Sequence, residues 1–193
     1  MNPETMQMVA RVFGGEALGK FWIGGASPKR SIFRAESVEW ATPQPLYDWL
    51  NDRFGPFDLD PAATAENAKT PRFFTEAEDG LTQDWSGAVY LNPPYGRGID
   101  RWVDKAWASS MSTGTRVVAL LPVRTDTEWW QTAVMRGARD VYLIRGRVSF
   151  GRGKKAVNAP FASCVVVWRG NTGGLAPTFH NLILPKGVRC ANV

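Results

Sequence analysis

The sequence contains few of the residues that build zinc centres and disulfide frameworks. Its 193 residues include one histidine, His180, and two cysteines, Cys164 and Cys190. The cysteines lie far apart and form no CxxC pair, so we expect reduced cytosolic thiols and no metal site. A single histidine excludes a multi-histidine zinc centre and disfavours catalysis by histidine.

Long apolar segments are lacking as well. No apolar run approaches the ~20 residues that cross a bilayer, and the N-terminus lacks the features of a secretion signal. We therefore expect a cytoplasmic protein with no membrane partner. Hydrophobic residues make up 44% and charged residues 21%, which excludes disorder, collagen and coiled coil as global descriptions. The length fits one domain.

Charge is distributed unevenly along the chain, whose net charge is +5. Residues 40–100 hold ten acidic and four basic residues, whereas residues 134–169 hold eight basic residues and one acidic residue. The basic segment includes GRGKK at 151–155, which suits the phosphates of a nucleic acid, although a solvated basic face has the same composition. The candidate nucleic-acid contacts are Arg145, Arg147, Arg152, Lys154 and Lys155.

Hydrophobic periodicity predicts alternating strands and helices. A helix begins at Thr42-Pro43, with Thr42 as its N-cap, and ends at Gly55-Pro56. The remaining predicted helices cover 99–110 and 126–136, and the predicted strands cover 57–60, 87–91, 116–122, 141–145, 148–150 and 162–168. This order predicts an α/β fold with a mostly parallel sheet that ends in a C-terminal antiparallel hairpin.

Domain organisation follows from the same pattern. Residues 1–36 show weak periodicity and paired glycines, which favours an N-terminal arm or appendage. The sheet and its helices occupy residues 37–170, and residues 171–193 are turn-rich and are interpreted as a C-terminal tail. In such sheets ligands bind at the carboxyl ends of the strands.

The strongest chemical motif follows the strand at 87–91 and consists of Asn92, Pro93, Pro94 and Tyr95. Two prolines make the segment rigid, which could merely end a strand. The same rigidity aims the Asn92 amide oxygen and a backbone carbonyl at one point, where they can accept both hydrogens of an aromatic amine. Tyr95 can stack on the ring that carries the amine. These are the requirements for methylating an exocyclic amino group.

A second candidate site follows the strand at 57–60. Asp60 could bind an ammonium group, and Pro61 and Ala62 allow a ligand to approach the backbone, although Asp-Pro is also common in turns. Thr42-Pro43 at a helix start could bind a carboxylate, although capping explains this pair equally well.

Two weaker acidic candidates lie between these motifs. Asp84-Trp85 could pair with an adenine amine and supply an aromatic wall, or could be a solvated acid beside a core tryptophan. Asp79 could bind ribose hydroxyls.

The ordered pattern TP…DLDPAAT.EN…DGL.QDW…NPPYGR.I..WV…LLP.RTDT.WW…RGR..F…APF.S over residues 38–168 resembles the phage-type Dam family of DNA adenine-N6 methyltransferases. The resemblance implies a class I methyltransferase (Rossmann-like) fold, S-adenosylmethionine as cofactor and adenine in double-stranded DNA as substrate. It implies that Asn92–Tyr95 is the catalytic motif, that the Asp60 segment and Thr42-Pro43 bind the cofactor, and that Phe161 walls the adenine pocket. The glycine-rich cofactor loop of many methyltransferases is absent after Asp60.

On this interpretation the adenine flips out of the duplex and the methyl group is transferred by direct displacement. The sequence leaves other functions open: methylation of RNA adenine or of a protein glutamine amide, a basic DNA-binding module without activity, and a nuclease. The last is disfavoured because the acidic residues show no clear metal-binding spacing.

Overall fold

Seven of the strands after residue 40 form one large sheet. A computed structural model describes residues 40–151, 157–188 and 190–191. The strand order is β2-β1-β3-β4-β8-β5-β9, and all strands run in the same direction except β8, which is antiparallel to β4 and β5. The bounds are β1 Leu59–Asp60, β2 Arg72–Phe73, β3 Ala88–Leu91, β4 Arg116–Pro122, β5 Asp140–Ile144, β8 Ser163–Arg169 and β9 Thr178–Leu182. The predicted mostly parallel α/β sheet is confirmed.

Both faces of the sheet are buried, which explains the nearly continuous apolar run of β4. Val117, Ala119 and Leu121 pack in one core with α3 (Ile99–Thr113). Val118 and Leu120 pack in the other core with α2 (Gln44–Phe54). Within the described ranges, no helix combines the length and apolar character needed to cross a membrane.

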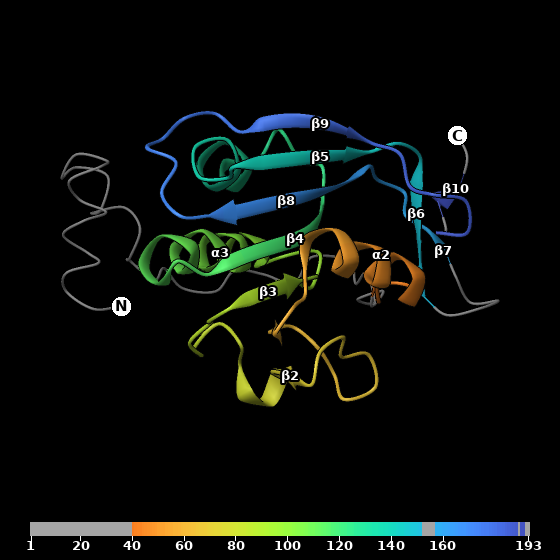
Figure 1. The fold of residues 1–193 in the computed structure, drawn as a ribbon, viewed down its shortest axis with the longest axis horizontal. Coiled ribbons are helices and arrows are strands. Elements are labelled where there is room, and N and C mark those ends of the chain that lie inside the picture. Colours follow the sequence, from red (N-terminus) through yellow and green to blue (C-terminus); the bar gives the residue numbers. More distant parts are fainter. Residues whose placement is uncertain (1–39, 152–156, 189, 192–193) are drawn as a thin grey trace, which may run out of the picture. The chain divides into compact units, whose positions relative to one another are not determined.

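A second, small sheet has the order β10-β6-β7, from β6 (Arg147–Phe150), β7 (Val157–Asn158) and β10 (Cys190–Ala191). β6 and β7 form an antiparallel hairpin. It lies at the edge of the large sheet toward which β5 and β9 point (Figure 1). The partner of β6 is therefore β7, while the predicted strand 162–168 corresponds to β8 in the large sheet.

Thr42 does not cap α2, contrary to the sequence prediction. The N-cap residue is Pro43, whose carbonyl accepts hydrogen bonds from the N–H groups of Leu46 and Tyr47. The Thr42 hydroxyl instead forms a buried hydrogen bond of 2.6 Å with the Tyr90 hydroxyl. The local sequence assigns the Thr42 side chain to the helix end, but this side chain bonds instead to a residue of β3 that is distant in the chain.

The predicted helix 126–136 is shorter and wider than expected. Its regular part is the π-helix η3 (Trp130–Val134), in which the Met135 N–H donates to the Trp130 carbonyl. The Trp168 indole N–H donates to the Ala133 carbonyl at 2.8 Å. That carbonyl is therefore bonded from outside the helix, near the point where the regular turns end.

The segment 171–193, interpreted from sequence as a tail, supplies two strands. Thr178–Leu182 pairs in parallel with β5 as β9, the last strand of the large sheet. Only Leu182 of β9 is buried, and Phe179 is 46% exposed. An edge strand with so few buried residues lacks the apolar alternation on which sequence prediction depends. The predicted arm 1–36 lies outside the described residues.

Candidate active site

The two motifs meet where the chain order in the sheet reverses. β1 and β3 are parallel neighbours, and the chain continues from β1 to β2 on one side and from β3 to β4 on the other. Asp60 ends β1, and Asn92 directly follows β3. In open α/β sheets ligands bind at such a switch point, in the crevice outside the carboxyl ends of the strands. The sheet order therefore makes this edge the candidate site.

One polar atom of the Asn92 side-chain amide is hydrogen-bonded to a described residue, and the other is not. Its Nδ2 donates a 2.7 Å hydrogen bond to the Trp40 carbonyl. A carbonyl can only accept, so this bond fixes which way the amide faces. The Asn92 Oδ1 atom is buried and has no hydrogen-bond partner among the described residues. A buried acceptor without a donor is costly, which is typical of an atom that binds a ligand.

Trp40 is held in this position from two sides. Its ring packs edge-on against Phe150, with centroids 5.3 Å apart, and against Phe161 at 5.4 Å. The next residue, Ala41, accepts a hydrogen bond of 3.0 Å from the Gly151 N–H. The segment before α2 therefore connects Asn92 to the end of β6.

Tyr95 lies beside these rings and is anchored at its hydroxyl. The hydroxyl donates to the Leu120 carbonyl at 2.9 Å, and the ring lies edge-on to Phe161 with centroids 5.5 Å apart. Burial raises the pKa of Tyr95 well above its ordinary value. The phenol is therefore neutral at physiological pH and offers a fixed aromatic wall.

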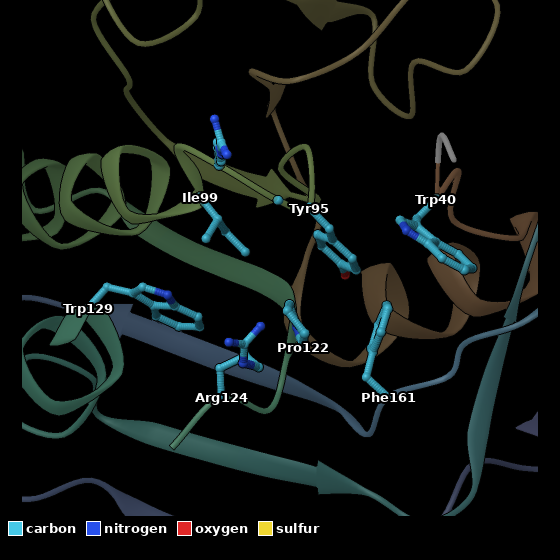
Figure 2. A pocket seen from close by; sticks show the side chains of 9 residues that line it. Trp40, Tyr95, Ile99, Pro122, Arg124, Trp129 and Phe161 are labelled. Carbon is cyan, nitrogen blue, oxygen red and sulfur yellow. The ribbon is translucent and has the colours of Figure 1, made fainter. Parts of the chain in front are cut away.

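These rings line a cavity of about 390 Å³ at the carboxyl ends of β3 and β4. Tyr95, Phe161 and Trp40 gather on one side of it, and Ile99, Trp129 and Arg124 on the other (Figure 2). Its size is within the range of ligand pockets. Flat aromatic walls suit a planar ring.

A smaller hollow of about 20 Å³ lies around Asp60 and Asn92. It is lined by Ala41, Thr42, Asp60, Ala62, Asn67, Lys69, Tyr90 and Asn92. Asp60 Oδ2 accepts the Lys69 N–H at 3.1 Å. Burial raises the pKa of Asp60 to about 6, and hydrogen bonds from the backbone N–H groups of Lys69 and Ala62 oppose that shift. The carboxylate thus organises the loop that follows β1.

The structure brings together the central residues of both predicted motifs. Thr42, Asp60, Ala62 and Asn92 line the small hollow, and Tyr95 and Phe161 line the large cavity. Four prolines flank these residues: Pro43 caps α2, Pro61 and Pro93 are buried, and Pro94 is exposed.

Trp85 was predicted as a possible adenine wall, and this interpretation is wrong. The ring is 2% exposed, stacks on Trp102 with centroids 6.2 Å apart and donates its N–H to the Gly80 carbonyl at 2.8 Å. It is the core tryptophan of the alternative interpretation. Asp84 and Asp79 are exposed, and neither lines the two hollows described above.

The predicted DNA contacts are described only in part. Arg145 is exposed just beyond the end of β5, and Arg147 is half-buried at the start of β6. Arg152, Lys154 and Lys155 lie outside the described residues.

Sequence reasoning missed Trp40, Arg97 and Trp129 as lining residues. Arg97 and Arg124 each follow a strand end closely, which was the available signal. No feature of the neighbouring sequence identifies Trp40 as a site residue, because its role depends on Asn92, 52 positions away.

Comparison with known proteins shows the family to which the chain belongs. The family model described as DNA N-6-adenine-methyltransferase (Dam) matches residues 31–178, which is more than half of the chain. The chain belongs to this family. The Dam-family relatives include the DNA N-6-adenine-methyltransferase of Haemophilus phage HP1, which is 34% identical over 124 residues. That match covers 63% of this chain and 71% of the HP1 protein.

The DNA N-6-adenine-methyltransferase of Escherichia phage T1 is 33% identical over 106 residues, covering 54% of this chain and 44% of the phage protein. The predicted family is confirmed, and the sheet described above agrees with the class I methyltransferase-like α/β fold expected of a Dam-family member. Membership makes the protein an adenine-specific DNA methyltransferase, a class of enzyme that requires a methyl donor.

Proposed function

We propose that the protein transfers the methyl group of S-adenosylmethionine to N6 of an adenine that has flipped out of duplex DNA. The observation that carries the mechanism is the unpartnered Asn92 Oδ1 atom. The N6 amine is a poor nucleophile because its lone pair is conjugated with the ring. Oδ1 accepts one of the amine hydrogens and stabilises the positive charge that develops on nitrogen as it attacks.

The large cavity receives the adenine. Tyr95 and Phe161 supply aromatic surfaces, and the Tyr95 hydroxyl bond to Leu120 keeps its ring fixed. A base inside a duplex cannot reach this cavity, so flipping is required, at a cost of a few kcal/mol. The Pro93 carbonyl is the second acceptor for the amine. The methylated nitrogen then releases one proton to water, so neither Asn92 nor Pro93 has to take up a proton.

The residues of the small hollow fit the amino-acid end of the donor by their chemistry. Asp60 pairs with an ammonium group, while Lys69 and Thr42 are suited to a carboxylate. A volume of about 20 Å³ admits about one water molecule, so the loop after β1 must open for binding. When bound, S-adenosylmethionine supplies an electrophilic methyl group, and the protein supplies position and electrostatics.

The test is to incubate the protein with S-adenosylmethionine and unmethylated plasmid DNA and to measure N6-methyldeoxyadenosine by mass spectrometry. We expect Asn92→Ala to lose nearly all turnover while still binding DNA. The matched control is Asn181→Ala, because Asn181 is exposed on β9. Turnover within a few-fold of wild type in Asn92→Ala contradicts the role of Asn92. Methylation of RNA or of a glutamine amide without methylation of DNA contradicts the substrate.

A further inference from the structure

The large cavity carries more positive charge than an adenine requires. Its lining includes two arginines, Arg97 and Arg124, and no aspartate or glutamate. Adenine is uncharged, so the proposed base pocket leaves these two guanidinium groups without a function. They come from separate segments, Arg97 from the turn between β3 and α3 and Arg124 from the turn after β4.

Arg124 lies across from the predicted adenine wall. β4 and β8 are antiparallel, with Pro122 paired to Ser163. The Val123 N–H donates to the Ala162 carbonyl at 2.9 Å, which extends the ladder by one residue. If this register is continued past Val123, Arg124 lies opposite Phe161. Arg124 and Phe161 both line the cavity, with Pro122 between them (Figure 2).

Neither arginine is neutralised by a strong partner. Arg124 Nε lies 3.4 Å from Asp126 Oδ1, but the two side chains are 54% and 73% exposed. Exposed pairs of this kind contribute little and exchange readily for a better anion. No hydrogen bond or ion pair to the Arg97 side chain occurs within the described ranges. Both guanidinium groups are therefore available to a ligand.

We propose that Arg97 and Arg124 bind a phosphate of the extruded nucleotide, so that the cavity receives the nucleotide and not the base alone. This inference rests on the proposed function, because it assumes that the aromatic side holds the adenine. A guanidinium presents a planar fork of donors that matches the oxygens of a phosphate. A cavity of about 390 Å³ with aromatic walls on one side and two guanidinium groups suits a ring joined to an anion.

The basic residues then have two separate roles in DNA binding. Residues of the segment 145–155 would attract DNA along its backbone. Arg97 and Arg124 would act only on the nucleotide that has left the stack, which offsets part of the cost of flipping. Phosphate contacts of this kind position a substrate and carry no sequence information.

The direct test compares small ligands in which only the phosphate differs. Wild-type protein is titrated by ligand-observed NMR with 2′-deoxyadenosine and with its 5′- and 3′-monophosphates. We expect at least one monophosphate to bind at least fivefold more tightly than the nucleoside. That preference should vanish in the double variant Arg97→Gln/Arg124→Gln. It should persist in Arg169→Gln, which changes an exposed arginine at the opposite edge of the sheet.

A second readout uses DNA itself. Losing the contact to one phosphate lowers the slope of log K against log salt by about 1, so the double variant should lose about 1 on an unmethylated duplex fragment. Its KM for plasmid DNA should rise several-fold with little change in kcat, as expected when ground-state and transition-state binding are lost equally. Thermal unfolding of all variants checks that they remain folded.

The outcomes separate the two proposals. A double variant that keeps the monophosphate preference, the salt slope and KM overturns the phosphate site even if the wild type methylates adenine. A wild-type protein that prefers the monophosphates but never methylates DNA supports the phosphate site and overturns the proposed function. Equal binding of nucleoside and monophosphates by the wild type overturns the phosphate site.

Discussion

Asn92 and Asp60 end neighbouring strands, but their surroundings leave them in opposite states. Asp60 is surrounded by its own loop and accepts the backbone N–H groups of Lys69 and Ala62. Asn92 is held through its donor alone, and its acceptor faces no donor among the described residues. The Asp60 carboxylate fixes a loop through two of its acceptor sites and keeps others for an ammonium group, whereas the Asn92 acceptor is wholly available to a substrate.

The Asp60 environment predicts a pH-dependent affinity for the methyl donor. Burial raises the pKa of Asp60 to about 6, so the carboxyl is mostly neutral at pH 5 and mostly charged at pH 7. Only the charged form attracts an ammonium group. We expect the affinity for S-adenosylmethionine, measured by calorimetry, to rise about tenfold from pH 5 to pH 7.

Two variants check this assignment. Asp60→Asn should bind the donor weakly at both pH values, with no rise between them. Asp52→Asn removes an exposed carboxylate on α2 and should keep the wild-type profile. A wild-type affinity that is flat from pH 5 to pH 7 would show that the ammonium group does not pair with Asp60.

At the scale of elements, the end of β1 depends on a close approach between two loops. Gly80 follows the left-handed residue Asp79 and lies so close to the chain after β1 that a Cβ there would overlap the Pro61 carbonyl oxygen. The Trp85 indole also bonds to the Gly80 carbonyl. Gly80 therefore holds the loop of residues 79–85 against the end of the strand that carries Asp60.

Gly80→Ala should separate these two segments. The clash is with backbone, which cannot rotate away, so we expect the free energy of unfolding to fall by about 1–3 kcal/mol. Urea denaturation measures this change, and donor affinity should fall with it because Pro61 follows Asp60 directly. Ala65→Ser adds one atom at an exposed position of the neighbouring loop and should change neither quantity. Unchanged stability in Gly80→Ala would mean that the two segments are not packed as described.

At the scale of the whole molecule, charge separates along the sequence into an acidic stretch, 40–100, and a basic stretch, 134–169. The acidic stretch contains Asp60 and the strand ends proposed to bind a cationic donor. The basic stretch contains β5, β6 and the segment 151–155, which suits DNA. One chain thereby presents fields of opposite sign to its two proposed ligands.

The basic segment predicts a measurable salt effect. Replacing Lys154 and Lys155 together by alanine should weaken DNA binding and lower the salt slope by about 2, since each phosphate contact contributes about 1. Fluorescence anisotropy at several salt concentrations measures both quantities. The double variant Arg136→Ala/Arg169→Ala removes two exposed arginines outside this segment and serves as control. A slope equal to wild type would remove Lys154 and Lys155 from the DNA interface.

The sequence by itself determined the alternation of strands and helices, the placement of Asp60 and Asn92 at strand ends, and the family. Buried parallel strands appear in the sequence as apolar runs, and the motif residues follow those runs directly. The local pattern was therefore sufficient to predict the strands and the positions of the motifs. Only the tertiary structure decided that Trp40 orients Asn92, that Trp85 belongs to the core, and that Arg124 and Phe161 line the same cavity. These relations join residues far apart in the chain, and packing fixes them, whereas hydrophobic periodicity describes only neighbours along one element.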